Sequence, residues 1–88
     1  MTTTTFEQSE RLVSCGLGLE SSDLLFVRRD FNPIINRKEY HGVAKAPCWS
    51  LGQLWRVVSQ KVKFQFDDCD TPEDIVESLV KLYEDATR

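Results

Sequence analysis

Histidine, the side chain most often used for acid–base catalysis, occurs once in the 88 residues of this chain, as His41. The cysteines Cys15, Cys48 and Cys69 form no C-x-x-C pair, and their separations of 33 and 21 residues match no zinc-site pattern. A nucleophilic pair of Cys48 and His41 would also need an orienting group, which cannot be named. We therefore expect no enzyme, no catalytic residue, no cofactor and no metal site, and we expect reduced thiols.

Long apolar runs and a basic leader are also missing. The first six residues hold four threonines without a basic flank or an apolar stretch, so we expect no secretory signal. Charged residues at 28% and aromatic residues at 10% exclude a disordered chain. At this mass about 64% of the unfolded surface is buried on folding, which is enough for one core. We expect one globular domain over residues 1–88, cytoplasmic and without membrane contact.

Phosphate-binding and metalloprotease motifs do not occur. Three aspartates, Asp67, Asp68 and Asp70, lie within four residues and superficially resemble a cation site. A calcium loop needs further ligands at fixed positions and a turn glycine, which residues 71–73 do not supply. We interpret the aspartates as a solvated loop that caps the next helix.

The N-terminal half predicts one short helix and two short strands. Capping-box spacing at Thr4 or Thr5 predicts a helix over residues 6–15, and Gly16 suits the left-handed position that ends it. Four consecutive apolar residues predict a buried strand over 24–27. A second extended stretch is expected from Ile34, reaching as far as residue 41. Residues 36–46 show no clear period.

The C-terminal half predicts two helices around a third strand. Ser50 and Gln53 have capping-box spacing and Trp49 and Leu54 have hydrophobic-staple spacing, which predicts a helix over 51–60. The alternation over residues 61–66 predicts a half-buried strand.

After an aspartate-rich loop, Asp70 or Thr71 caps a last helix with Pro72 in its first turn. Its broad apolar face over residues 75–86 is typical of a helix packed on a sheet. The expected fold class is α+β, with three helices packed on a small, mainly antiparallel sheet.

The segment from Pro47 to Leu54 reads Pro-Cys-Trp-Ser-Leu-Gly-Gln-Leu. It resembles a P-x-W-S-L-x-x-L stretch in short uncharacterised proteins of Bacteroidetes genomes, many of them from phages or mobile elements. Both ends are also similar, with a short helix closing near Gly16 and a final helix over 73–86. The relatives usually have a leucine-proline after the tryptophan helix, where this chain continues into residues 58–60. The resemblance implies a small intracellular accessory protein and transfers no catalytic residue.

Charge is segregated along the chain. Residues 1–27 carry one cation against four carboxylates, residues 28–63 eight cations against two carboxylates, and residues 67–88 two cations against eight carboxylates. We expect the acidic C-terminal third to neutralise the basic middle within the fold and to leave no groove that tracks phosphates. Binding of random oligonucleotides is then expected to be weaker than about 100 μM.

Two functions stay open. The first is a non-catalytic protein-interaction module with an unidentified protein partner, anchored by Tyr40 or Trp55 where exposed, although Trp55 is expected in the core. The alternative is nucleic-acid binding through the basic segment 28–63, which also carries Phe31, Tyr40 and Trp49. A sequence pI near 5.0 and the lack of a helix-turn-helix or RNP motif count against it. The candidate contacts for either partner are Arg28, Arg29, Arg37, Lys38, Tyr40 and Lys45.

Overall fold

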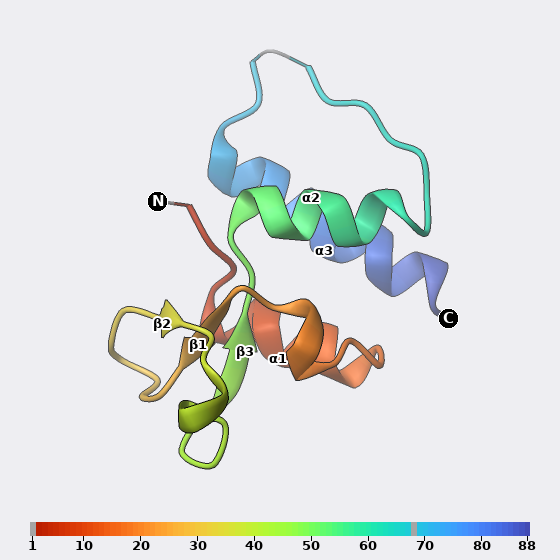
Figure 1. Cartoon of the computed structure of the whole chain (residues 1–88). Helices are drawn as coiled ribbons and strands as arrows, with labels where there is room; N and C mark the ends of the chain where they lie inside the picture. The colour runs from red at the N-terminus through yellow and green to blue at the C-terminus, as the bar shows by residue number, and fades with distance from the viewer. Residues whose placement is uncertain (1, 68) are drawn as a thin grey trace.

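The computed structural model describes residues 2–67 and 69–88 and contains three α-helices and one three-stranded antiparallel sheet (Figure 1). In chain order the elements are α1 (Phe6–Ser14), the 3-10 turn η1 (Leu19–Ser21), β1 (Leu24–Phe26), β2 (Ile34–Ile35), the 3-10 turn η2 (Lys38–Tyr40), β3 (Ala46–Cys48), α2 (Leu51–Ser59) and α3 (Pro72–Ala86). The predicted α+β class is confirmed.

The sheet has the order β2-β1-β3, so β1 is central and β2 and β3 are its edges. Leu24 of β1 lies opposite Ile35 of β2 and Cys48 of β3. The β3 side is covered, because Thr3 forms a bridge with Ser50 and α1 packs against β3. The two sheet edges therefore differ, and we call residues 24–48 the sheet lobe.

The strand predicted over residues 61–66 does not form. This segment runs as an irregular loop above α2 and α3 (Figure 1) and pairs with no described strand. Its side chains still alternate, with Val62, Phe64 and Phe66 packed against the main core. The third strand is instead β3, an Ala-Pro-Cys stretch whose Pro47 lies on an edge strand, where a missing N–H is tolerated.

Local signals fixed the ends of α1. Gln8 N–H donates to Thr5 Oγ1 at 3.1 Å and Thr5 N–H donates to Gln8 Oε1 at 2.9 Å, which confirms the second of the two expected capping boxes. Gly16 has a φ of 96°, as its left-handed position requires. Leu17 N–H then donates to the Leu12 carbonyl at 3.1 Å, so the chain folds back on the helix end.

The other two helices are capped by hydroxyls. Ser50 Oγ accepts from Gln53 N–H at 3.3 Å, but the reciprocal half of the expected capping box is replaced, because the Gln53 amide donates to the Ser21 carbonyl at 2.8 Å. Thr71 caps α3 and accepts from Asp74 N–H at 3.2 Å. These caps confirm where both helices begin.

The main core lies between the helices rather than between a helix and the sheet. α3 packs mainly against α1 and α2, so its predicted packing on a sheet is wrong. Trp49 and Leu54 are fully buried in this core, as the staple requires. Trp55, expected in the core, is 40% exposed and contacts Phe64 and Phe66 with ring centroids 4.9 and 5.6 Å away.

A smaller core lies under the sheet lobe, where Phe6 of α1 packs edge-on against Phe26 at 5.6 Å. Among the described residues, no helix combines the length and the apolar character that crossing a membrane requires.

Candidate functional site

The sheet lobe carries a groove of about 770 Å³ along the edge formed by β2. Its lining residues are Thr3, Leu24, Asn32, Pro33, Ile34, Ile35, Arg37 and Tyr40. The groove therefore brings together the N-terminal segment, two strands and the turn η2.

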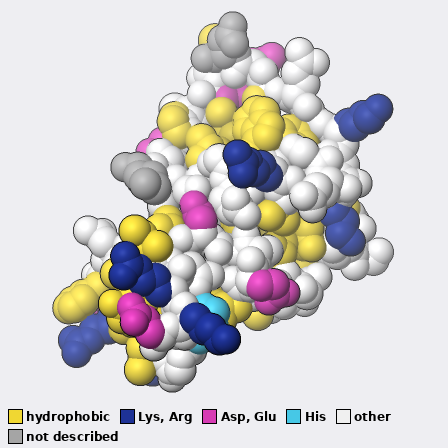
Figure 2. Space-filling view, viewed as in Figure 1, with side chains coloured by type: hydrophobic (Ala, Val, Ile, Leu, Met, Phe, Trp, Pro, Cys, Tyr) yellow, Lys and Arg dark blue, Asp and Glu magenta, His cyan; other side chains and the backbone are white. Residues whose placement is uncertain are grey.

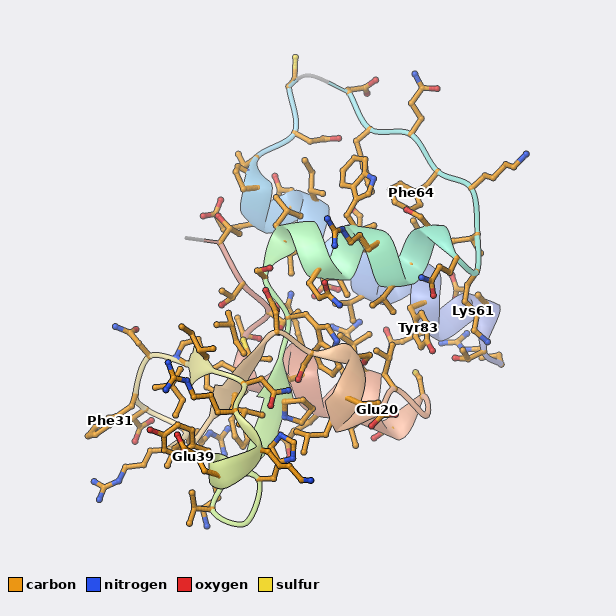
Figure 3. All side chains as sticks on the ribbon, viewed as in Figure 1. Glu20, Phe31, Glu39, Lys61, Phe64 and Tyr83 are labelled. Atoms are coloured by element: carbon orange, nitrogen blue, oxygen red, sulfur yellow. The ribbon has the colours of Figure 1, made fainter. Side chains whose placement is uncertain are left out.

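Apolar side chains are exposed on the sheet lobe, and two of them, Ile34 and Ile35, line the groove. Ile35 is 62% exposed, and Ile34, Phe31 and Val43 are exposed as well. Figure 3 shows Phe31 pointing away from the sheet at the tip of the loop between β1 and β2. A gathering of this kind on one lobe is typical of a surface that a partner covers.

Cations surround the same lobe. The five predicted basic contacts, Arg28, Arg29, Arg37, Lys38 and Lys45, are all exposed, and Tyr40 is half-buried. In Figure 2 hydrophobic side chains lie beside Lys and Arg side chains at the lower left of the molecule. Of the six candidates, Arg37 and Tyr40 line the groove itself.

Two of the arginines are held by neighbours. Arg29 pairs with Glu7 at 2.7 Å and lies over the Phe6 ring, and this contact lowers the pKa of the Glu7 carboxyl. The Arg28 guanidinium lies 5.1 Å from the centroid of the Phe31 ring. Among residues 2–67 and 69–88, Arg37 has one carboxylate within 4 Å, that of Glu39 at 3.9 Å, which is beyond hydrogen-bond distance.

The predicted neutralisation of the basic middle by the acidic C-terminal third is wrong. Between residues 28–63 and the described part of 67–88 there is no ion pair. Arg11 of α1 instead donates hydrogen bonds to the carboxylates of Glu77 and Glu84 on α3, and these contacts lower the pKa of both glutamates. The reason is geometric, because α3 docks on α1 and α2 and not on the sheet lobe.

The catalytic pair considered from the sequence is not assembled. His41 Nε2 lies 2.6 Å from Asn36 Oδ1, whereas the thiol of Cys48 is buried against Thr4, 3.5 Å from its carbonyl oxygen. Burial raises the pKa of the Cys48 thiol and so disfavours the thiolate that a nucleophile needs.

Cys15, Cys48 and Cys69 are free thiols. Over residues 2–67 and 69–88, no three potential metal ligands cluster together. In the aspartate-rich loop, Asp70 accepts a hydrogen bond from Asp67 N–H at 3.2 Å, and Asp68 lies outside the described residues. The Asp70 carboxylate is thus hydrogen-bonded to the backbone of its own loop.

Sequence reasoning named Arg37 and Tyr40 but missed the apolar half of the groove. At Ile34 and Ile35 the sequence predicts only a short extended stretch, in which adjacent side chains point to opposite faces. Two consecutive isoleucines directly after Asn32-Pro33, in a stretch without polar alternation, were the available signal of an exposed edge.

Comparisons with protein-family models, with curated proteins and with solved structures each found no match to this chain. A functional proposal therefore depends on the geometry and chemistry of the sheet lobe.

Proposed function

We propose that this chain is a non-catalytic protein-interaction module, a small cytoplasmic accessory protein that binds its partner through the groove beside β2. The observation that carries the proposal is the exposure of Ile34 and Ile35 on the rim of a groove that also holds Arg37 and Tyr40. Binding sites of this kind combine apolar surface with a few polar groups that set orientation.

The energetics favour a partner over solvent at this surface. Covering one exposed isoleucine contributes about 1.5–3 kcal/mol at most, so two isoleucines and a tyrosine provide enough apolar area for a weak, specific contact. The backbone around them is held by the sheet, because β1 is bonded on both sides. A rigid surface loses little conformational freedom when it is covered.

A selection from a random peptide library displayed on phage tests this proposal. We expect the selected peptides to lose binding at least tenfold, about 1.4 kcal/mol, when Ile35→Asp places a carboxylate on the groove. Val13→Asp is the matched control, because Val13 is 45% exposed on α1 and takes no part in the groove. Equal losses for both variants, or no selected peptide at all, would contradict the proposal.

Nucleic-acid binding remains the alternative, because the cations of the sheet lobe form no ion pair with the described residues of the acidic C-terminal third. Carboxylates of Glu7, Asp30 and Glu39 interleave with those cations, and this weakens the field that a phosphate backbone would meet. A titration with random single- and double-stranded oligonucleotides at low salt separates the two functions. We expect dissociation constants above about 100 μM. Micromolar binding that weakens steeply with salt would favour the alternative.

A further inference from the structure

We propose that the occupant of the groove is an extended, acidic and apolar segment of a partner protein, which pairs with the backbone of Ile35 and places a carboxylate on Arg37. This inference rests on the proposed function and specifies the class of partner.

The free edge of β2 supports backbone pairing. Asn36 N–H donates to the Asp23 carbonyl at 3.1 Å, and the register places Ile35 opposite Leu24. Because hydrogen-bonded and non-bonded pairs alternate in an antiparallel ladder, Ile35 belongs to a non-bonded pair. Its N–H and C=O therefore point away from β1, toward the side on which a further strand would lie.

The length of this edge limits what can be added. Pro33 stands two residues before Ile35 on the same outward side and has no N–H to offer. On the other side, Arg37 is still extended, with φ −127° and ψ 142°. An added segment therefore pairs over residues 35–37 only, so side chains and charge must supply most of its affinity.

The charge of the sheet lobe selects an acidic segment. Residues 24–48 carry five cations against two carboxylates. Arg37 lines the groove with a side chain that is 62% exposed, and the Glu39 carboxylate, 3.9 Å from its Nη1, is too far away to accept a hydrogen bond from it. A guanidinium and a carboxylate can form two parallel hydrogen bonds, which fixes the register as well as the charge of the ligand.

The apolar lining of the groove indicates that the partner segment also carries apolar residues. Leu24, Ile35 and Tyr40 line it with hydrocarbon and aromatic surface. Ile35 and Arg37 are two positions apart on an extended stretch, so their side chains lie on the same face of it. The apolar residue that meets Ile35 and the carboxylate that meets Arg37 must therefore also lie on one face of the added segment, two positions apart. An apolar residue and an acidic residue two positions apart are the expected sequence signature.

Three synthetic peptides of eight residues test the inference. They are two repeats of Val-Thr-Asp-Thr (the Val-Asp peptide), of Val-Thr-Lys-Thr (the Val-Lys peptide) and of Thr-Thr-Asp-Thr (the Thr-Asp peptide), each with its two variable positions on one face of an extended chain. Their binding is followed by the amide shifts of the isotope-labelled protein in NMR at low salt. We expect the Val-Asp peptide to bind at least tenfold more tightly than the other two, and to shift the amides of Ile35 and Arg37. The Val-Lys peptide tests charge and the Thr-Asp peptide tests apolar contact.

Two variants isolate the carboxylate contact. Arg37→Glu is expected to reverse the preference so that the Val-Lys peptide binds better than the Val-Asp peptide, which a merely destabilised fold would not do. Glu39→Gln is expected to strengthen Val-Asp binding about twofold, because it removes a competing carboxylate. An unchanged ranking of the peptides in Arg37→Glu would overturn the assignment to Arg37.

Methylation of the backbone nitrogens of the Val-Asp peptide tests strand pairing, and unaltered affinity would overturn it. If library-selected peptides occupy the groove but are neither acidic nor sensitive to this methylation, the inference fails while the proposed function stands. If no peptide binds the groove, both fail. The inference is also overturned if oligonucleotides bind this surface at micromolar concentration, or if sedimentation shows self-association that Arg37→Glu abolishes.

Discussion

The two tryptophans, six positions apart, have opposite environments. Trp49 is fully buried and its indole N–H donates to Ser21 Oγ at 3.2 Å, whereas Trp55 leaves 40% of its surface in water. Trp49 precedes the helix cap and enters the main core, to which α1, α2 and α3 all contribute side chains. Trp55 lies on the outer side of α2, where the loop after the helix covers only part of it.

Replacement of Trp49 is expected to cost far more stability than replacement of Trp55. Trp49→Ala leaves a cavity in the core and should lower the free energy of unfolding by about 3–5 kcal/mol. Trp55→Ala removes a half-solvated ring and should cost about 1–2 kcal/mol. Chemical denaturation of both variants measures the difference. Equal midpoints would contradict the staple assigned to Trp49.

The three thiols are expected to react in the order of their exposure. Cys69 is exposed, Cys15 is half-buried and Cys48 is buried with a raised pKa. A thiol reagent should therefore label Cys69 first and Cys48 only after unfolding. Mass spectrometry of peptides from a time course gives the order. Three labels per chain are expected under denaturing, non-reducing conditions, and fewer would indicate a disulfide.

At the scale of elements, helix ends were predictable because their signals are local. Hydroxyl caps at Thr5, Ser50 and Thr71 and the glycine after α1 act within a few residues. Strand assignment failed where it depended on a distant partner. The alternation over residues 61–66 predicts correctly which side chains face the core. It does not predict whether another strand lies beside this segment.

The backbone of residues 63–66 is expected to exchange its amide hydrogens quickly. Over the described residues, no hydrogen bond is made by these four N–H groups, whereas β1 lies between two strands. Exchange in heavy water followed by NMR should therefore be near the unprotected rate at Phe64 and slow at Leu25. Slow exchange at Phe64 would indicate that residues 61–66 form a hydrogen-bonded strand.

For the whole molecule, Arg11 joins the N-terminal helix to the C-terminal one, as Gln8 does through its amide, which donates to Glu77 at 2.9 Å. Arg11 donates to Glu77 at 2.9 Å and also to Glu84, so one arginine on α1 holds two turns of α3. The sequence placed all three residues on helices, but it did not show which cations the acidic helix would meet. That depends on which face of the molecule α3 covers, and the broad apolar stripe on α3 is compatible with a sheet or with two helices.

The stabilisation from Arg11 should depend on pH. Both glutamate pKa values lie below their ordinary 4.5 in the folded state, so the contribution is complete above that pH and is lost as the pH falls through the folded values. Arg11→Met should cost on the order of 1 kcal/mol at neutral pH and much less at an acidic pH at which both glutamates are protonated in the folded state.

Denaturation at both pH values measures this change. Arg56→Met is the control, because Arg56 is exposed and forms no ion pair among the described residues. A cost of Arg11→Met that stays constant with pH would show that its alkyl chain, and not its charge, stabilises the fold.

The separation of Arg11 from its partners in sequence sets a kinetic order. Glu77 and Glu84 lie 66 and 73 positions away, so these contacts close nearly the whole chain into a loop. Contacts across so long a loop carry a high closure entropy and form late in folding. Arg11→Met should therefore leave the refolding rate nearly unchanged and should shorten the lifetime of the folded state.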